Sequence, residues 1–408
     1  MLKIFSCWWS FCIMTVLAMF FFPGCGAKEP AEPLESGLIP LGAEKKEELF
    51  AHLDPARQGL NSWEELAQPL RDSLSALKFH EENQVVLNTP NVRLTVQDLR
   101  ISLKHMLRIL PELETDPGLL SREFTCYELR PEPLFTGYYE PRLQASLEQM
   151  PGYPYPLYAV PENLQSIDLG RFHPRWKGQR LVYRIEDGEI APYHARAEID
   201  GQNALQGKAE ILAWAEDPVD VFFLHIQGSG QLELPDGQRA YIGYAGKNGH
   251  EYVSLGRVLV ERGHLRFEDL SMQSIKAHLR DQPELMPDIL FTNPSYVFFE
   301  LRNDGPYGAL GRKLTPMVSL ATDPAVIPLG ALLAMQVDLP GMRSKDTLSG
   351  LGLAQDVGGA IQGRHVDLYC GSGDQAGHLA GQLKVQGRLC LLVSRTAASQ
   401  PGREISSK

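Results

Sequence analysis

The sequence predicts a mainly β protein with flanking helices, organised as two β-rich regions. From about residue 124 to 244, short alternating or apolar runs are broken by Gly, Pro and Asp-Gly pairs, a texture typical of strands and hairpins. From 250 to about 290 helical periodicity replaces it, and after Asn293 the β texture returns. The 408 residues are enough for two or three domains with cores of their own.

The composition excludes one large class of partner. Charged residues make up 22% of the chain and apolar residues 43%, which is an ordinary globular balance. The formal net charge of −11 gives no general attraction for nucleic acid. We therefore expect no nucleic-acid partner.

The first 25 residues have the character of an export signal. Lys3 precedes a long apolar run that ends at Phe22, and Pro23, Gly24 and Cys25 follow. This ending resembles a bacterial lipoprotein cleavage site, which would leave Cys25 as the lipidated first residue of a protein on the periplasmic face of the outer membrane. The alternative is an uncleaved helix over residues 4–22 that anchors the chain in the inner membrane.

Residues 26–42 are rich in Pro, Gly and Glu and predict a flexible tether, and residues 398–408 predict a disordered tail. Cys126, Cys370 and Cys390 follow no zinc-binding spacing, so we expect ordinary small core residues.

Two helices are expected before the first β-rich region. Ser62 and Glu65 have capping-box spacing, and Thr95 begins the second helix. Both helices carry an apolar stripe: Leu66, Leu70, Leu74 and Leu77 in the first, and Leu99, Leu103, Met106 and Leu110 in the second. Further along, Asp187-Gly188 and Asp236-Gly237 are hairpin signals.

Several familiar sites are excluded by spacing. His250-Glu251 lacks the second histidine of a zinc-protease helix. Ser229 lies between glycines but without nucleophile-elbow spacing, and "GGAIQG" does not match the dinucleotide-binding pattern. No Walker loop occurs. These exclusions give no reason to expect a metal or another cofactor.

Three aspartates in glycine-rich turns of the C-terminal part remain: Asp323, Asp356 and Asp367. Asp323 precedes a proline and could simply make a turn, and Asp356 could bond to the turn amides of "VGGA". The three could also hold a metal ion, although they lack an EF-hand frame. Asp367 is harder to dismiss, because a half-buried strand disfavours an unpartnered carboxylate.

Strand alternation gives Asp367 specific neighbours. His365, Asp367 and Tyr369 would share one face of a strand, and Val366 and Leu368 the other. The strand follows a turn that carries Gly358, Gly359 and Gly363, so the carboxylate lies beside both an imidazole and a glycine-rich turn.

At this point the chain resembles a known family, the membrane-bound lytic transglycosylase A (MltA) family. The resemblance spans about residues 120–395 and rests on motifs that occur in the order of the family: "LFTGYYEP", "AEIDG", "VFFLHIQGSG", "YAGKNGHEY", "SMQSIK", "NPSYVFF", "SLATDPAVIPLG" and "AQDVGGAIQGRHVDLYCGSG". The C-terminal part resembles the three-aspartate (3D) domain, whose acidic residues match Asp323, Asp356 and Asp367.

The resemblance implies a fold of two β domains with a groove between them. Residues 43–140 and 296–397 would form a double-psi β-barrel, and residues 141–295 an inserted, smaller β-barrel with helices.

The resemblance also implies a reaction. The β-1,4 bond between N-acetylmuramic acid and N-acetylglucosamine in peptidoglycan would be cleaved with formation of a 1,6-anhydromuramic acid end. Asp367 would be the single general acid/base, with Asp356 and Asp323 shaping its surroundings. The alternatives are a hydrolase that uses Asp356 as a second carboxylate and a non-catalytic peptidoglycan-binding lipoprotein.

Further site residues follow from the same resemblance. Thr136 would lie in the groove, and Tyr138, Tyr139, Gln227 and Tyr296 would contact sugar, with Tyr296 equally well a core residue. The implied partners are peptidoglycan glycan strands, the membrane through the lipid anchor, and proteins of cell-wall synthesis or division.

Overall fold

The computed structural model describes residues 37–340 and 347–398. The predicted signal, Cys25 and most of the predicted tether lie outside this part of the chain. The tether prediction was wrong at its C-terminal end, because Gly37–Pro40 form a strand in which Leu38 is buried. Ala398, the first residue of the predicted tail, still belongs to a helix.

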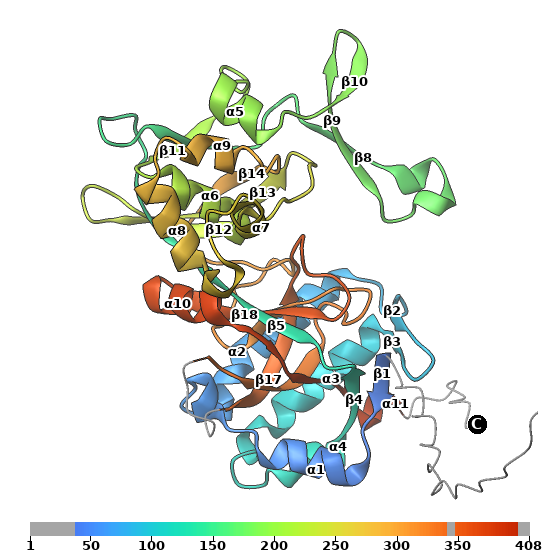
Figure 1. The fold of residues 1–408 in the computed structure, drawn as a ribbon. Coiled ribbons are helices and arrows are strands. Elements are labelled where there is room, and N and C mark those ends of the chain that lie inside the picture. The colour runs from blue at the N-terminus through green and yellow to red at the C-terminus, as the bar shows by residue number, and fades with distance from the viewer. Residues whose placement is uncertain (1–36, 341–346, 399–408) are drawn as a thin grey trace, which may run out of the picture. The chain divides into compact units, whose positions relative to one another are not determined.

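Within the described residues, the largest sheet has nine strands drawn from both ends of the chain (Figure 1). In spatial order they are β1 (Gly37–Pro40), β4 (Phe124–Arg130), β20 (Arg388–Ser394), β16 (Leu332–Asp338), β17 (Thr347–Asp356), β15 (Ser319–Ala321), β18 (His365–Ser372), β5 (Leu134–Glu140) and β19 (Lys384–Gln386).

The pairing of β18 with β5 is parallel and joins distant parts of the sequence. Asp367 lies opposite Thr136, and Tyr369 lies opposite Tyr138. Because side chains of paired residues project from the same face of a sheet, these four side chains share one face.

Helices from both ends of the chain accompany this sheet. They are α1 (Ala43–Ala51), α2 (Ala67–Ala76), α3 (Val96–Ile109), α4 (Gly118–Glu123), α10 (Asp374–Gln382) and α11 (Arg395–Ala398). The predicted stripe of α3 is confirmed, since Leu99, Leu103, Met106 and Leu110 are buried in the core of this region. A short hairpin of β2 (Val85–Asn88) and β3 (Arg93–Thr95) precedes α3.

The two predicted helix starts have different outcomes. Thr95 begins α3 with a capping box, in which Asp98 accepts hydrogen bonds from the backbone and the hydroxyl of Thr95. Ser62 instead precedes a 3-10 helix and makes no side-chain cap, and Glu65 accepts hydrogen bonds from Asn61. The capping-box prediction at Ser62 was therefore wrong, because Glu65 accepts from the backbone N–H of Asn61 and the Ser62 side chain accepts from no backbone N–H of the helix.

A second sheet has six strands, all from the middle of the chain. Their order is β14 (Val297–Arg302), β13 (Arg239–Lys247), β12 (Ser229–Glu233), β6 (Arg142–Ser146), β11 (Ile211–Ala215) and β7 (Tyr155–Tyr158). Its helices are α5 (Arg196–Gln202), α6 (Pro218–Gln227), α7 (Leu255–Glu261), α8 (Met272–Asp281) and α9 (Met286–Leu290).

The chain passes from the nine-stranded sheet to the six-stranded sheet close to residue 140. β5 ends at Glu140 and β6 begins at Arg142. The chain returns to the nine-stranded sheet later than the predicted residue 296, because β14 pairs with β13 and keeps residues 297–302 in the six-stranded sheet.

A three-stranded sheet of β8 (Gln165–Asp168), β9 (Arg180–Glu186) and β10 (Glu189–Pro192) lies within the same middle segment. Asp187 and Gly188 both have positive φ and close the β9–β10 hairpin, as the sequence predicts. The second predicted hairpin joins β12 to β13 through the turn that contains Gly237.

The cysteines in the described residues match the expectation of core positions. Cys126, Cys370 and Cys390 are free and buried. Over the same residues, no helix has both the length and the apolar character that a membrane span requires.

Candidate active site

Asp367 projects from β18 as the alternation predicts. Val366 and Leu368 are buried in the core on one face, while His365 and Asp367 are half-buried on the other. The hydroxyl of Thr136 on β5 donates a hydrogen bond of 2.7 Å to Asp367 Oδ1. The parallel register therefore brings Thr136 of the "FTGYYEP" motif to Asp367.

The carboxyl of Asp367 holds a proton more strongly than an ordinary aspartate. Burial disfavours its charged form and raises its pKa to about 7, against the opposing effect of the Thr136 hydrogen bond. The negative charge of Asp356 raises the pKa further. A carboxylic acid with a pKa near neutrality can both give and take a proton at physiological pH.

Asp356, the last residue of β17, is held by three donors. Its Oδ1 accepts hydrogen bonds of 2.9 Å from the backbone N–H groups of Val357 and Ala309, and its Oδ2 accepts one of 3.0 Å from the phenol of Tyr138. Burial nevertheless raises its pKa. Both oxygens are thus fixed in place beside the face that carries Asp367.

Asp323 has a structural position, and it also reaches the glycine-rich turn. Its Oδ1 accepts a hydrogen bond from Ala325 N–H, which is the turn expected before a proline. Its Oδ2 accepts a hydrogen bond of 2.7 Å from the N–H of Gly363, whose φ of 62° suits glycine. Asp323 therefore fixes the loop that leads into β18.

Tyr139 and Gln227 are joined to each other. The backbone N–H of Tyr139 donates a 3.0 Å hydrogen bond to Gln227 Oε1. The Tyr139 ring is buried with Cys370, Ala376 and Ala380. This burial does not fit the sugar contact that was predicted for it. Gln227 ends α6, so this bond links the six-stranded region to β5.

Tyr296 lies in a core, and the prediction of a sugar contact does not fit its burial. The side chain is 1% exposed and its phenol donates to Asp200. The Arg196 guanidinium lies 4.9 Å from the centre of its ring. The neighbouring apolar run "VFF" is the signal that favours this core alternative.

Two residues that were not among the predicted site residues contact β5 or β18, the strands that carry Thr136 and Asp367. His365 Nε2 is 2.8 Å from the Thr136 hydroxyl oxygen, and the shared strand face was the available signal. Glu140 is buried and accepts hydrogen bonds from Gln231 (2.7 Å) and Ser372 (2.6 Å), which ties β5 to both sheets. No local pattern points to Glu140, since its partners are far away in sequence.

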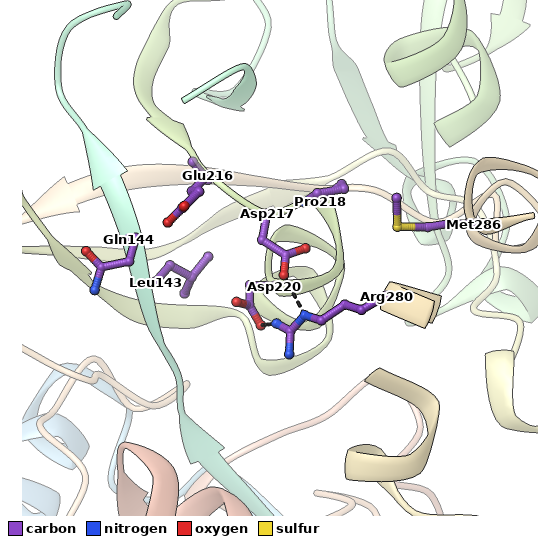
Figure 2. Close-up of a pocket in the computed structure, with 9 residues that line it drawn as sticks. Leu143, Gln144, Glu216, Asp217, Pro218, Asp220, Arg280 and Met286 are labelled. Carbon is purple, nitrogen blue, oxygen red and sulfur yellow. Dashed lines mark hydrogen bonds and ion pairs between the residues drawn. The ribbon is translucent and has the colours of Figure 1, made fainter. Parts of the chain in front are cut away.

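A polar pocket of about 470 Å³ lies in the six-stranded region and contains none of the three aspartates (Figure 2). Arg280 donates to Asp217 at 2.7 Å and lies 2.9 Å from Asp220, so the charges that face each other in the pocket are paired. We assign it no chemistry. Among the described residues no group of three or more His, Cys, Asp or Glu side chains could hold a metal ion.

Comparison with known proteins matches both regions to described families. The model of the MltA specific insert domain matches residues 134–300, which run from β5 into β14. The model of the 3D domain matches residues 318–393, which contain Asp323, Asp356 and Asp367.

One relative is the membrane-bound lytic murein transglycosylase A of Escherichia coli K12. It is 36% identical over 272 residues, which are 65% of this chain and 66% of the relative. The match thus spans just under two thirds of the relative's length.

Solved structures extend the similarity over most of the chain. A crystal structure of MltA from Neisseria gonorrhoeae is 32% identical, covers 90% of this chain and 96% of its own, and has a TM-score of 0.70. A crystal structure of E. coli MltA with bound chitohexaose is 26% identical, covers 90% of this chain and 93% of its own, and has a TM-score of 0.55. With both regions matched by family models and an MltA structure 32% identical covered over 96% of its length, the chain belongs to the MltA family.

Proposed function

We propose that this protein is a lytic transglycosylase that cleaves the β-1,4 bond between N-acetylmuramic acid and N-acetylglucosamine in peptidoglycan. The observation that carries the proposal is the single carboxyl of Asp367, with its raised pKa and its hydrogen bond from Thr136. The names of the relatives and the chitohexaose bound to E. coli MltA support it. Chitohexaose shares the β-1,4 backbone of a glycan strand.

In the first half of the reaction Asp367 acts as an acid. Its proton passes to the glycosidic oxygen while the bond from that oxygen to C1 of the muramyl residue breaks. General acid assistance is typically worth about 10²–10⁴-fold in rate. The raised pKa supports this role, because a large share of the protein molecules still have a protonated Asp367 near pH 7.

In the second half Asp367 acts as a base. The C6 hydroxyl of the same muramyl residue attacks C1, and the carboxylate of Asp367 takes the hydroxyl proton. The product is a 1,6-anhydromuramic acid end, and the enzyme regains its protonated acid. The nucleophile, the C6 hydroxyl, belongs to the substrate and is held next to C1. The enzyme therefore needs no second carboxylate to activate a water molecule.

The contacts of Asp356 argue against the hydrolase alternative. A base that activates water needs a free lone pair, and Asp356 already accepts three of the about four hydrogen bonds that a carboxylate can accept, two from backbone amides and one from Tyr138. We assign Asp356 the role of holding Tyr138 and adding negative charge near Asp367. Asp323 would position the turn before β18.

The substrate contacts follow from exposure. We assign Thr136 and Tyr138 to the sugar-facing side of the site, because both are half-buried on the face that carries Asp367. Gln227, also half-buried, would contribute a sugar contact from the end of α6.

The finer architecture belongs to the same proposal, with a double-psi barrel around the nine-stranded sheet, a smaller barrel around the six-stranded sheet, and a groove for the glycan between them.

We also propose that the protein is held at a membrane, as the name of the E. coli relative says of that protein. Lipid on Cys25 would be the anchor and the outer membrane its location. Proteins of cell-wall synthesis or division would be further partners.

The mass of the product tests the reaction. Purified peptidoglycan digested with this protein should yield muropeptides whose anhydro ends are lighter by about one water than hydrolysed ends. A digest that contains only reducing ends would replace this proposal with the hydrolase, and no release at all would favour a binding protein.

A further inference from the structure

His365 lies at the end of a line of hydrogen bonds that leads to Asp367. Its Nδ1 is 3.2 Å from the carbonyl oxygen of Ala360, and its Nε2 is 2.8 Å from the Thr136 hydroxyl. The hydroxyl is in turn 2.7 Å from Asp367 Oδ1. The three contacts join four polar groups in one continuous series: the Ala360 carbonyl, the His365 ring, the Thr136 hydroxyl and the Asp367 carboxyl.

The number of hydrogens on this line is limited. A threonine hydroxyl has one hydrogen, and a carbonyl oxygen can only accept. If Thr136 donates to an ionised Asp367, the contact with His365 requires a hydrogen on Nε2, and the Ala360 carbonyl requires another on Nδ1. His365 is then an imidazolium opposite a carboxylate.

The other arrangement has no charges. Asp367 carries a hydrogen on Oδ1 and donates to Thr136, Thr136 donates to Nε2 of His365, and Nδ1–H donates to Ala360. Both arrangements contain three hydrogens for three contacts. They differ by the shift of two hydrogens along the line, and no proton enters from water.

We propose that His365 is a positioning residue that shares one proton with Asp367 through the Thr136 hydroxyl. The inference rests on the proposed function. When Asp367 gives its proton to the glycosidic oxygen, two hydrogens remain for three contacts, so one contact joins two lone pairs. The deficit makes the carboxylate a stronger base, and the proton from the C6 hydroxyl restores the third hydrogen.

The charges near this line remain the same in the variants proposed below. They are Asp356, which contacts Tyr138, Arg364 next to the histidine, and Lys384, which lies opposite Thr136 on β19. Their effects therefore cancel when variants are compared.

The coupling can be measured without substrate. ¹⁵N shifts of the His365 ring, followed against pH, report which nitrogens carry hydrogen. Asp367→Asn should change the ¹⁵N shifts of the His365 ring when Thr136 is present, because asparagine cannot exchange a proton along the line. The same substitution should have a clearly smaller effect in a Thr136→Val background, because valine has no hydroxyl to relay the proton. Equal shifts in the two backgrounds, or no shift in either, would overturn the proposal.

Activity gives a second readout. His365→Gln can still hydrogen-bond to Thr136 but cannot exchange a proton, so kcat should fall on the order of tenfold with little change in KM. His80→Gln, at an exposed histidine, should leave both constants unchanged. A His365→Gln variant within about twofold of wild type would contradict the proposal.

The two readouts separate this inference from the proposed function. If wild-type protein releases no anhydro product, the proposed function fails, while the ring shifts still decide whether His365 and Asp367 share a proton. If His365→Gln does not fold, the ring shifts of the proteins that keep His365 decide alone.

Discussion

Asp367 has a carboxyl whose environment suits one group that works as both acid and base. Asp367→Asn keeps the size of the side chain but cannot release or recover a proton. We expect its turnover to fall by about 10²-fold or more, with glycan binding and folding retained. Release of anhydromuropeptides, with thermal unfolding as control, measures this.

Asp356→Asn is the matched comparison. Its amide oxygen can still accept hydrogen bonds, and the proton carrier at Asp367 remains, so the loss of turnover should be smaller. A larger loss at Asp356 than at Asp367 would exchange their roles.

The raised pKa of Asp367 also predicts two dependences on pH. Because the acid must be protonated, kcat/KM should decline as the pH rises through about 7. A folded-state pKa above the value of about 3.9 in an unfolded chain contributes stability that is present below pH 4 and lost as the pH rises through about 7.

Asp367→Asn removes this loss of stability. The melting temperature of the variant should therefore rise relative to wild type between pH 4 and pH 8, and thermal scans at several pH values measure it. A difference that stays constant over this range would show that the folded-state pKa of Asp367 is not raised.

The structural position of a single residue could be predicted from sequence where it depends on neighbouring residues in the chain. The turn at Asp323 depends on the next few residues, and the face of Asp367 follows from strand alternation. Tyr139 and Tyr296 could not be separated from exposed aromatics, because their burial depends on distant elements. The three aspartates could be selected from their glycine-rich turns, but the role given to each of them depended on the family resemblance.

At the scale of elements, β5 lies close against α10. A Cβ atom added at Gly137 would lie 2.8 Å from Ala380 Cα and 2.9 Å from Cys370 Sγ, so either the helix or the strand must move. Gly137→Ala should cost about 1–3 kcal/mol of stability. It should also reduce turnover, because Thr136 and Tyr138 flank this glycine on β5.

Gly359→Ala is a suitable control for stability. A Cβ there meets nothing within 4 Å, so we expect a change within about 0.5 kcal/mol. Chemical denaturation of both variants measures the contrast. Equal stabilities would mean that the contact between β5 and α10 can relax without cost.

Elements with local signals were predicted well. The α3 helix has its cap and stripe within 16 residues, and the Asp187-Gly188 hairpin needs only a two-residue turn. The parallel partner of β18 has no local signal, since β5 is more than 200 residues away. The barrel and groove expectations came from the resemblance and remain proposals.

At the scale of the whole molecule, the anchor is the main prediction. Cys25→Ser should release the protein from the membrane or change its location, because the thiol that would carry lipid is absent. Fractionation and mass spectrometry of the mature N-terminus test this. A mature protein that begins at Met1 without lipid would favour the uncleaved-helix alternative.

The distance along the chain between Thr136 and Asp367 has a consequence for biosynthesis. The two residues are 231 positions apart, and everything that builds the six-stranded sheet is made between them. At about 5–20 residues per second, β5 waits on the order of 10 seconds or more after its own synthesis before β18 exists. Under the proposed function, a nascent chain interrupted anywhere in that interval lacks the general acid/base Asp367 and would have no lytic activity.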